Sequence, residues 1–157
     1  MADFEDTLPS TDSLQTVFRL QTELNDYVFR NNGLVGSDGK ALTMATIAHA
    51  VDQGRLTVND LPNQWLVRYT KAMEEELGEL KEDLLWKWWS QDSVDIQNVR
   101  VELVDILHFL VSAMIAAGLT PRKVLDLYEQ KNTLNRTRQD SGYSQATKTE
   151  NDNRSIE

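Results

Sequence analysis

The sequence contains no cysteine, which excludes disulfide bonds and thiolate metal sites. It also lacks an excess of positive charge, because 16 lysines and arginines face 25 aspartates and glutamates, for a formal net charge of −9. Such a surface repels a nucleic-acid backbone, so we expect no nucleic-acid partner. A phosphorylated substrate would then need compensation from metal ions or from a few well-placed cations.

Long uninterrupted apolar runs are missing as well. The most apolar stretch, residues 101–119, contains Glu102, Asp105 and His108 and therefore differs from a membrane span. The first residues of the chain are acidic, without the basic start and apolar core of a signal peptide. We therefore expect a soluble, intracellular protein that does not bind a membrane.

What the sequence does contain is helical periodicity. Its 157 residues, 40% of them apolar, suffice for one domain with a single core. Apolar residues recur every three or four positions and no stretch keeps a period of two, so we expect an all-α bundle of about five helices. The predicted helices span about 13–30, 43–53, 61–85, 95–118 and 120–138. We expect a flexible arm at 1–12, the folded domain at 13–139 and a polar tail at 140–157.

Capping residues predict where several of these helices begin and end. Thr43, Asp95 and Thr120 stand where an N-cap is expected, and Pro121 follows the last of them as a first helical residue. Gly118 is suited to the position just after the end of the fourth helix.

The helix predicted over 95–118 is apolar around nearly its whole circumference, which is typical of a helix buried on most sides. Within it, Glu102, Asp105, His108 and Ser112 fall in one stripe, at spacings of three and four. Isolated buried carboxylates are costly, and two carboxylates three residues apart repel each other. A divalent cation would turn that repulsion into binding, whereas the alternative is a solvated face paired with lysine and arginine.

A second acidic pattern lies on the helix predicted over 61–85. Its apolar face contains Tyr69, Met73, Leu77, Leu80 and Leu84. Glu76 and Glu79 are the carboxylates that we expect to point inward, with Asp83 flanking the same face. Glu74, Glu75 and Glu82 are expected to be solvated. The pairs Glu76/Glu79 and Glu102/Asp105 would together offer four hard oxygen donors, a set that suits Mg²⁺ or Mn²⁺ better than zinc.

Two amides interrupt the apolar face of the first predicted helix. Gln21 and Asn25 lie near the centre of a face formed by Leu14, Val17, Phe18, Leu24 and Val28. Buried amides need partners, so either they form a structural hydrogen bond with a neighbouring helix, or they line a pocket and contact the edge of a base. His108 has the same two interpretations, a satisfied core group or a base contact.

Tryptophans and cations form two further candidate regions. Trp86, Trp88 and Trp89 are either core or dimer contacts or a stacking surface for a base. Lys87 among them is a candidate phosphate-binding cation. The basic stretch 131–138 is either a helix C-terminus that favours cations or a clamp for a triphosphate.

Five ordered blocks of sequence together resemble a known family. They are LQTELND at 20–26, EEELGEL at 74–80, WKWW at 86–89, ELVDILHF at 102–109 and KNTLNRTRQDSGY at 131–143. The series resembles the all-α nucleoside triphosphate pyrophosphatases, the MazG-like superfamily, and within it most of all the dimeric dUTPases and related phage dCTP/dUTP pyrophosphatases. The resemblance covers roughly residues 14–143.

The resemblance implies roles for residues in each block. Glu76, Glu79, Glu102 and Asp105 match the metal-binding carboxylates, which implies two or more Mg²⁺ ions (Mn²⁺ being the alternative) and Glu76 or Glu79 as the catalytic base. Gln21, Asn25 and His108 match positions that contact the pyrimidine, beside Trp86 or Trp89. The residues that match the phosphate- and sugar-binding block are Lys131, Asn135, Arg138 and Tyr143.

The implied activity is hydrolysis of a deoxynucleoside triphosphate between the α and β phosphates, which gives a nucleoside monophosphate and pyrophosphate. We expect dUTP as the substrate, with dCTP next, and a homodimer whose pockets are completed near its interface. One alternative is a MazG-like house-cleaning enzyme for other or modified nucleotides, purines included. Another is a non-catalytic helical interaction module.

Overall fold

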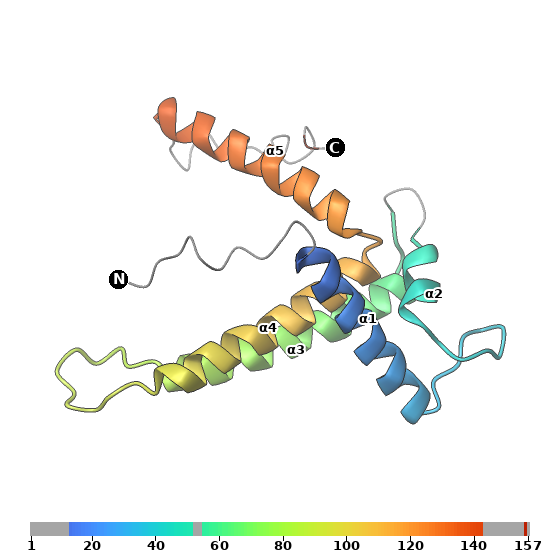
Figure 1. Ribbon diagram of the computed structural model, residues 1–157, viewed down its shortest axis with the longest axis horizontal. Helices are drawn as coiled ribbons and strands as arrows, with labels where there is room; N and C mark the ends of the chain where they lie inside the picture. The colour runs from blue at the N-terminus through green and yellow to red at the C-terminus, as the bar shows by residue number, and fades with distance from the viewer. Residues whose placement is uncertain (1–12, 52–54, 143–155, 157) are drawn as a thin grey trace. The chain divides into compact units, whose positions relative to one another are not determined.

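The computed structural model describes residues 13–51, 55–142 and 156, and these residues form five α-helices (Figure 1). The helices are α1 (Ser13–Asn31), α2 (Met44–His49), α3 (Leu61–Asp83), α4 (Ile96–Ala116) and α5 (Pro121–Asp140). No β-strand occurs in the described ranges, where an isolated antiparallel bridge pairs Val35 with Ala41. The predicted all-α fold is confirmed. The chain divides into two compact units, residues 1–119 and 120–157.

The predicted caps are confirmed because each is a matter of local chemistry. The side chains of Thr43, Asp95 and Thr120 accept hydrogen bonds from backbone N–H groups of the first turns of α2, α4 and α5. Gly118 has a φ of 75°, and its N–H and that of Leu119 donate to carbonyls of the last turn of α4. This is the hydrogen-bond pattern of a Schellman motif.

Two helices are shorter than their apolar patterns predict. The helix α2 ends at His49 instead of continuing to residue 53, and residues 52–54 lie outside the described part of the chain. The helix α3 ends at Asp83 because Leu84 has an extended backbone, with φ −94° and ψ 134°.

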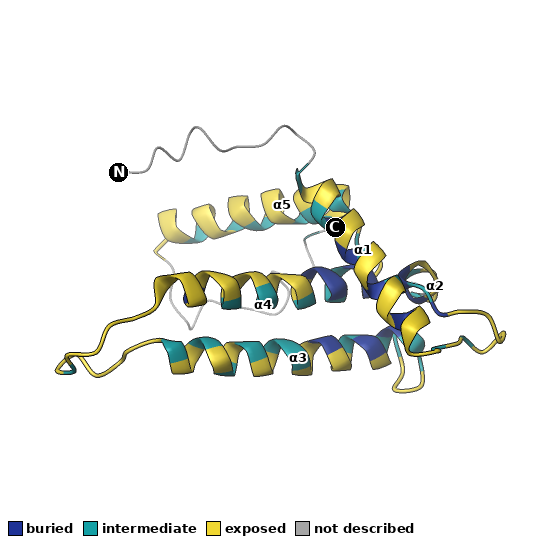
Figure 2. Ribbon diagram, turned by 60° about the horizontal axis from the view of Figure 1, so that its bottom comes forward, coloured by how far each residue is buried: buried dark blue, intermediate teal, exposed yellow. Residues whose placement is uncertain are grey.

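In the first unit, α3 and α4 form a long antiparallel hairpin, and α1 and α2 pack against one end of it (Figure 1). Figure 2 shows most of the buried residues where α1 and α2 meet the start of α3 and the end of α4, whereas most of the far halves of α3 and α4 is partly or fully exposed. Core residues at this end include Phe29, Met44, Ile47, Trp65 and Val111. The hairpin thus has one end anchored in a core and one end that projects from it.

Several apolar faces predicted from the sequence are wrong in part. On α1 the buried residues are Phe18, Gln21, Asn25 and Phe29, whereas Leu14, Leu24 and Val28 are exposed. Leu77 on α3 and Leu84 just after its end are also exposed. The physical reason on α1 is that both amides find hydrogen-bond partners on α4, and these bonds offset the desolvation cost of burying them.

The helix α4 is buried much less than predicted. Its buried residues are Val99 near the start and Val111, Ser112, Ile115 and Ala116 near the end. Exposed apolar side chains lie between them, namely Val101, Leu103, Val104, Leu107 and Leu110. Although α4 is apolar around nearly its whole circumference, much of it is therefore not buried within the single chain.

The second unit consists of α5 and the residues that follow it. None of the described α5 residues is buried, and Val124, Leu127 and Leu134 are half-buried. Arg122 forms an i,i+4 ion pair with Asp126 at 3.0 Å.

By length and composition, no single helix of the described residues could cross a membrane. The helices α4 and α5 reach the required length and apolar composition only when they are counted together as one interrupted segment.

Candidate metal centre

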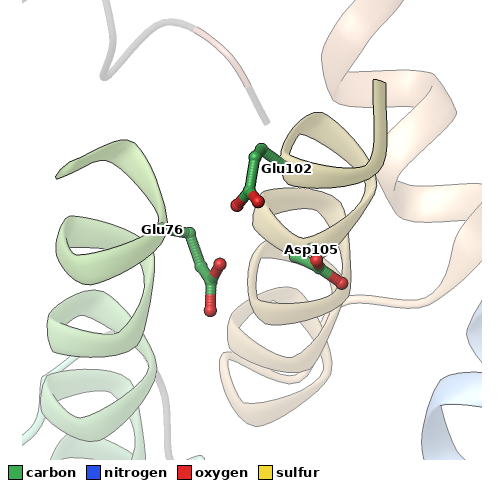
Figure 3. A group of neighbouring side chains, drawn as sticks. All are labelled: Glu76, Glu102 and Asp105. Atoms are coloured by element: carbon green, nitrogen blue, oxygen red, sulfur yellow. The ribbon is translucent and has the colours of Figure 1, made fainter. Parts of the chain in front are cut away.

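Three of the four predicted metal-binding carboxylates converge between α3 and α4. Glu76 comes from α3, and Glu102 and Asp105 come from α4, and one carboxylate oxygen of each lies within 4.8 Å of the others. Figure 3 shows the side chains of Glu76 and Glu102 reaching into the space between the two helices. The spacing of three places Glu102 and Asp105 on the same side of α4, one turn apart.

One oxygen of this cluster lacks a partner. Glu102 is half-buried, and its Oε2 atom is shielded from solvent without a hydrogen bond in the described structure. A shielded carboxylate oxygen of this kind is costly unless a cation or a donor satisfies it. A hard divalent cation fits this observation, because carboxylate oxygens are the ligands that Mg²⁺ and Mn²⁺ prefer.

Carboxylates beyond these three also contribute to the electrostatic repulsion within the cluster. Desolvation raises the pKa of Glu76, and the charges of Glu79, Asp105 and Glu75 raise it further. The pKa of Glu102 is also raised, by desolvation first and then by Glu79, Asp83, Glu76 and Asp105. Glu79, the fourth predicted ligand, is exposed but acts on both groups. The cluster as it stands is therefore a site of concentrated negative charge.

Asn98 is a member of this site that the sequence pattern did not indicate. It is exposed, and its Nδ2 atom donates a hydrogen bond to Asp83 Oδ2 and, at 3.5 Å, to Glu102 Oε1. Asp83 is the last residue of α3, so this amide joins the end of one helix to the start of the next. A signal was present in the i,i+4 spacing of Asn98 and Glu102, but not in any apolar periodicity.

The two buried amides form a hydrogen-bond network with α4. Ser112 Oγ accepts from Gln21 Nε2 and from Asn25 Nδ2, both at 2.9 Å, and donates to the His108 carbonyl. Gln21 Nε2 also donates to Asn25 Oδ1, and Gln21 Oε1 lies 2.5 Å from His108 Nδ1. The structural hydrogen bond to a neighbouring helix, one of the two interpretations, is thus present, and contact with a base stays a prediction. Ser112 belongs to this network and not to the carboxylate cluster.

A largely apolar cavity of about 270 Å³ lies beside this network, between α1 and α4. Gln21 and His108 contribute its polar groups, and its other lining residues are Val17, Leu20, Leu24, Val104, Leu107 and Val111. A cavity with a few polar groups among apolar side chains is typical of a small-molecule site.

The WKWW tryptophans lie in the loop between α3 and α4, with side chains that are exposed to solvent. Trp86, Trp88 and Trp89 are 76%, 88% and 60% exposed, and the Trp89 ring meets the other two edge-on. The Lys87 Nζ atom lies 5.5 Å from the centre of the Trp86 ring. The interpretation of these residues as core is therefore wrong for this chain, while a dimer contact and a stacking surface for a base stay predictions.

The predicted phosphate-binding block lies outside the first unit. Lys131, Asn135 and Arg138 are on α5, within the second unit. Tyr143 lies outside the described residues. Their roles stay predictions.

Comparison with known proteins gives consistent matches. A family model described as dUTPase matches residues 13–123. The dCTP pyrophosphatase of Enterobacteria phage T4 is 26% identical over 106 residues, which cover 68% of this chain and 56% of that protein. The dCTP pyrophosphatase of Enterobacteria phage LZ5 is 30% identical over 88 residues, which cover 48% of this chain and 51% of that protein. The chain thus spans about half the length of these curated relatives. No solved structure gives a significant match.

Proposed function

The chain belongs to the dUTPase family, and on that basis we propose that it is a Mg²⁺-dependent deoxynucleoside triphosphate pyrophosphatase. It cleaves the α–β phosphoanhydride bond and releases a nucleoside monophosphate and pyrophosphate. The observation that supports this proposal most directly is the convergence of Glu76, Glu102 and Asp105 between α3 and α4. Two or more Mg²⁺ ions, or Mn²⁺, would be held there by these residues together with Glu79.

The chemistry follows from what these side chains can do. Divalent cations, when bound, neutralise phosphate charge and make a water molecule more acidic. The carboxylates supply the negative charge that holds such cations, and Glu76 is one candidate for the base that accepts a proton from the water. Glu79, more exposed and next to it on α3, is the other candidate for the base.

For the base of the nucleotide we propose the cavity between α1 and α4. Gln21 and His108 line it, Asn25 supports Gln21, and a ring from Trp86 or Trp89 would stack on the base. The family description favours dUTP, and the names of the two phage relatives favour dCTP as its close rival. Lys87 and the block Lys131, Asn135, Arg138 and Tyr143 are the proposed phosphate and sugar contacts.

We also propose that the protein is a homodimer. Exposed apolar residues gather on α1 and α4 around the cavity, among them Leu20, Leu24, Val104 and Leu107. Soluble monomers seldom leave large contiguous apolar surfaces exposed. A second copy would bring an identical apolar surface, and two-fold pairing of such surfaces is the commonest arrangement in oligomers.

The test is pyrophosphate release from dUTP, dCTP, dTTP, dATP and dGTP, each with Mg²⁺ and with excess chelator. We expect turnover of dUTP or dCTP that disappears with chelator. Turnover of purines would favour the house-cleaning alternative and contradict the base pocket. No turnover of any nucleotide would contradict the proposed enzymatic activity and favour the non-catalytic interaction module.

A matched pair of variants assigns the activity to the cluster. Glu102→Gln removes one charge from the site. We expect kcat/KM to fall by at least about 100-fold, because substitutions around a metal site lower metal affinity and activity strongly. Glu82→Gln removes the same charge from an exposed position of α3 and should leave kcat/KM within about twofold. Equal activity of both variants would contradict the proposed centre.

A further inference from the structure

Asn98 occupies a defined place at the start of α4. It is the third residue of the helix, and its backbone N–H donates to the capping carboxylate Asp95 Oδ1 at 3.2 Å. The cap fixes the first turn, and the side chain of Asn98 then reaches Asp83 at the end of α3. Its amide therefore lies where the two helices that hold the carboxylates come together.

The orientation of this amide follows from its neighbours. The Nδ2 atom has two hydrogens and two acceptors within reach, Asp83 Oδ2 and Glu102 Oε1. An amide oxygen in the same place would face two carboxylates and be repelled. The donor side of Asn98 is therefore the side that faces the cluster.

The position of Asn98 determines which oxygen of Glu102 stays available to bind a cation. The amide approaches Oε1, whereas Oε2 is shielded from solvent and has no hydrogen-bond partner. We propose that Asn98 is a positioning residue for the metal centre, which holds Glu102 by Oε1 and leaves Oε2 for the cation. This inference rests on the proposed metal-dependent function. A lysine in this place would add a positive charge and oppose the cation, but a neutral amide orients the carboxylate without doing so.

A purely structural role is the rival explanation, because the contact with Asp83 also ties the end of α3 to the start of α4. The two roles differ in what they change. A tie between helices affects the melting temperature of the metal-free protein. A positioning residue affects the affinity for the cation itself, because a misaligned ligand binds less well.

The experiment is calorimetric titration of the full chain with MnCl₂, without nucleotide, together with the melting temperature in chelator. We expect Asn98→Ala to weaken Mn²⁺ binding about 10-fold. The control is Gln97→Ala, the exposed neighbour on the same turn, which should stay within about twofold of the unaltered protein. A lower melting temperature for Asn98→Ala with unchanged Mn²⁺ affinity would overturn the positioning role.

A double-mutant cycle tests whether Asn98 acts through Glu102. In a Glu102→Gln background the oriented carboxylate is gone, so adding Asn98→Ala should change Mn²⁺ affinity by less than about twofold. An equal loss in both backgrounds would show that Asn98 acts elsewhere and would overturn the inference. Unaltered protein that binds no Mn²⁺ would overturn the metal centre together with the role of Asn98. Unaltered protein and Asn98→Ala binding Mn²⁺ equally well would overturn the role of Asn98 alone.

Discussion

Glu76, Glu102 and Asp105 place negative charges close together on two helices that are covalently joined by one loop. Folding desolvates these carboxylates and brings their charges together, and the raised pKa values of Glu76 and Glu102 reflect desolvation first and repulsion second. A site of this kind lowers the free energy of unfolding of the metal-free protein, and a bound cation raises it again. Its pH dependence is therefore opposite to that of a carboxylate in a salt bridge.

The first prediction concerns that pH dependence in chelator. The folded pKa of Glu102 lies above the ordinary value of 4.5, so between these values the folded chain binds more protons than the unfolded chain. The free energy of unfolding then falls as pH rises through this window. We expect Glu102→Gln to melt at a higher temperature than the unaltered protein at pH 7, with the difference shrinking as pH falls towards about 4.5.

Thermal melts at a series of pH values in chelator measure this difference directly. Excess MgCl₂ at pH 7 should raise the melting temperature of the unaltered protein and have little effect on Glu102→Gln. A difference between the two proteins that is independent of pH would contradict the electrostatic origin of the destabilisation.

Some residues of the site could be predicted from the sequence, and others could not. Helix periodicity predicts that Glu102 and Asp105 share a face of one helix and that Glu76 lies beside the apolar face of another. Antiparallel packing of the two helices was the further assumption that predicted their meeting. The i,i+4 spacing of Asn98 and Glu102 was a signal, but the contact of Asn98 with Asp83 could not be found this way, because it depends on where α3 ends. The exposure of Trp88 was equally hidden, since aromatic composition says nothing about what covers a ring.

At the scale of the helices, ends were more predictable than faces. A cap such as Asp95 acts on N–H groups two and three residues away, so the local sequence contains the whole interaction. The buried face of α1 depends instead on Ser112, 91 residues from Gln21 along the chain. The pattern within α1 placed both amides at the centre of the apolar face, but it could not show their partner on α4 or that Leu24 and Val28 would be exposed.

The second prediction tests this contact between α1 and α4. Ser112→Ala removes the acceptor for Gln21 and Asn25 and leaves a buried amide donor unsatisfied. We expect a loss of about 1–3 kcal/mol in the free energy of unfolding. Urea denaturation measures it, with Thr70→Ala as a control. Thr70 is an exposed helical hydroxyl whose removal should change stability by less than about 0.5 kcal/mol.

An unchanged stability of Ser112→Ala would mean that water replaces the serine hydroxyl and that the network contributes little to α1 packing. The same variant bears on function, because His108 and Gln21 belong to one network and also line the cavity. A rise in KM for dUTP with kcat retained would support a base-binding role for that network.

At the scale of the whole chain, the balance between core and surface supports association. The core occupies one end of the hairpin (Figure 2). The helices α1 and α4 retain exposed leucines and valines along much of their length. The apolar composition of α4 predicted a helix buried on most sides, and in this single chain it is not. A dimer through these surfaces would account for both observations, because burial missing within one copy would be supplied by the other.

The last prediction tests that dimer. Leu24 and Val104 line opposite walls of the cavity between α1 and α4 and are 46% and 50% exposed. A glutamate at either position would be desolvated in a dimer interface, so Leu24→Glu and Val104→Glu should dissociate the protein. We expect light scattering after size exclusion to give about twice the chain mass of 17.9 kDa for the unaltered protein and about the chain mass for both variants.

The control is Val58→Glu, which alters a side chain that is 78% exposed and lies before α3, and this variant should remain dimeric. A monomeric unaltered protein would contradict the dimer, and dimeric variants would place the interface on another surface.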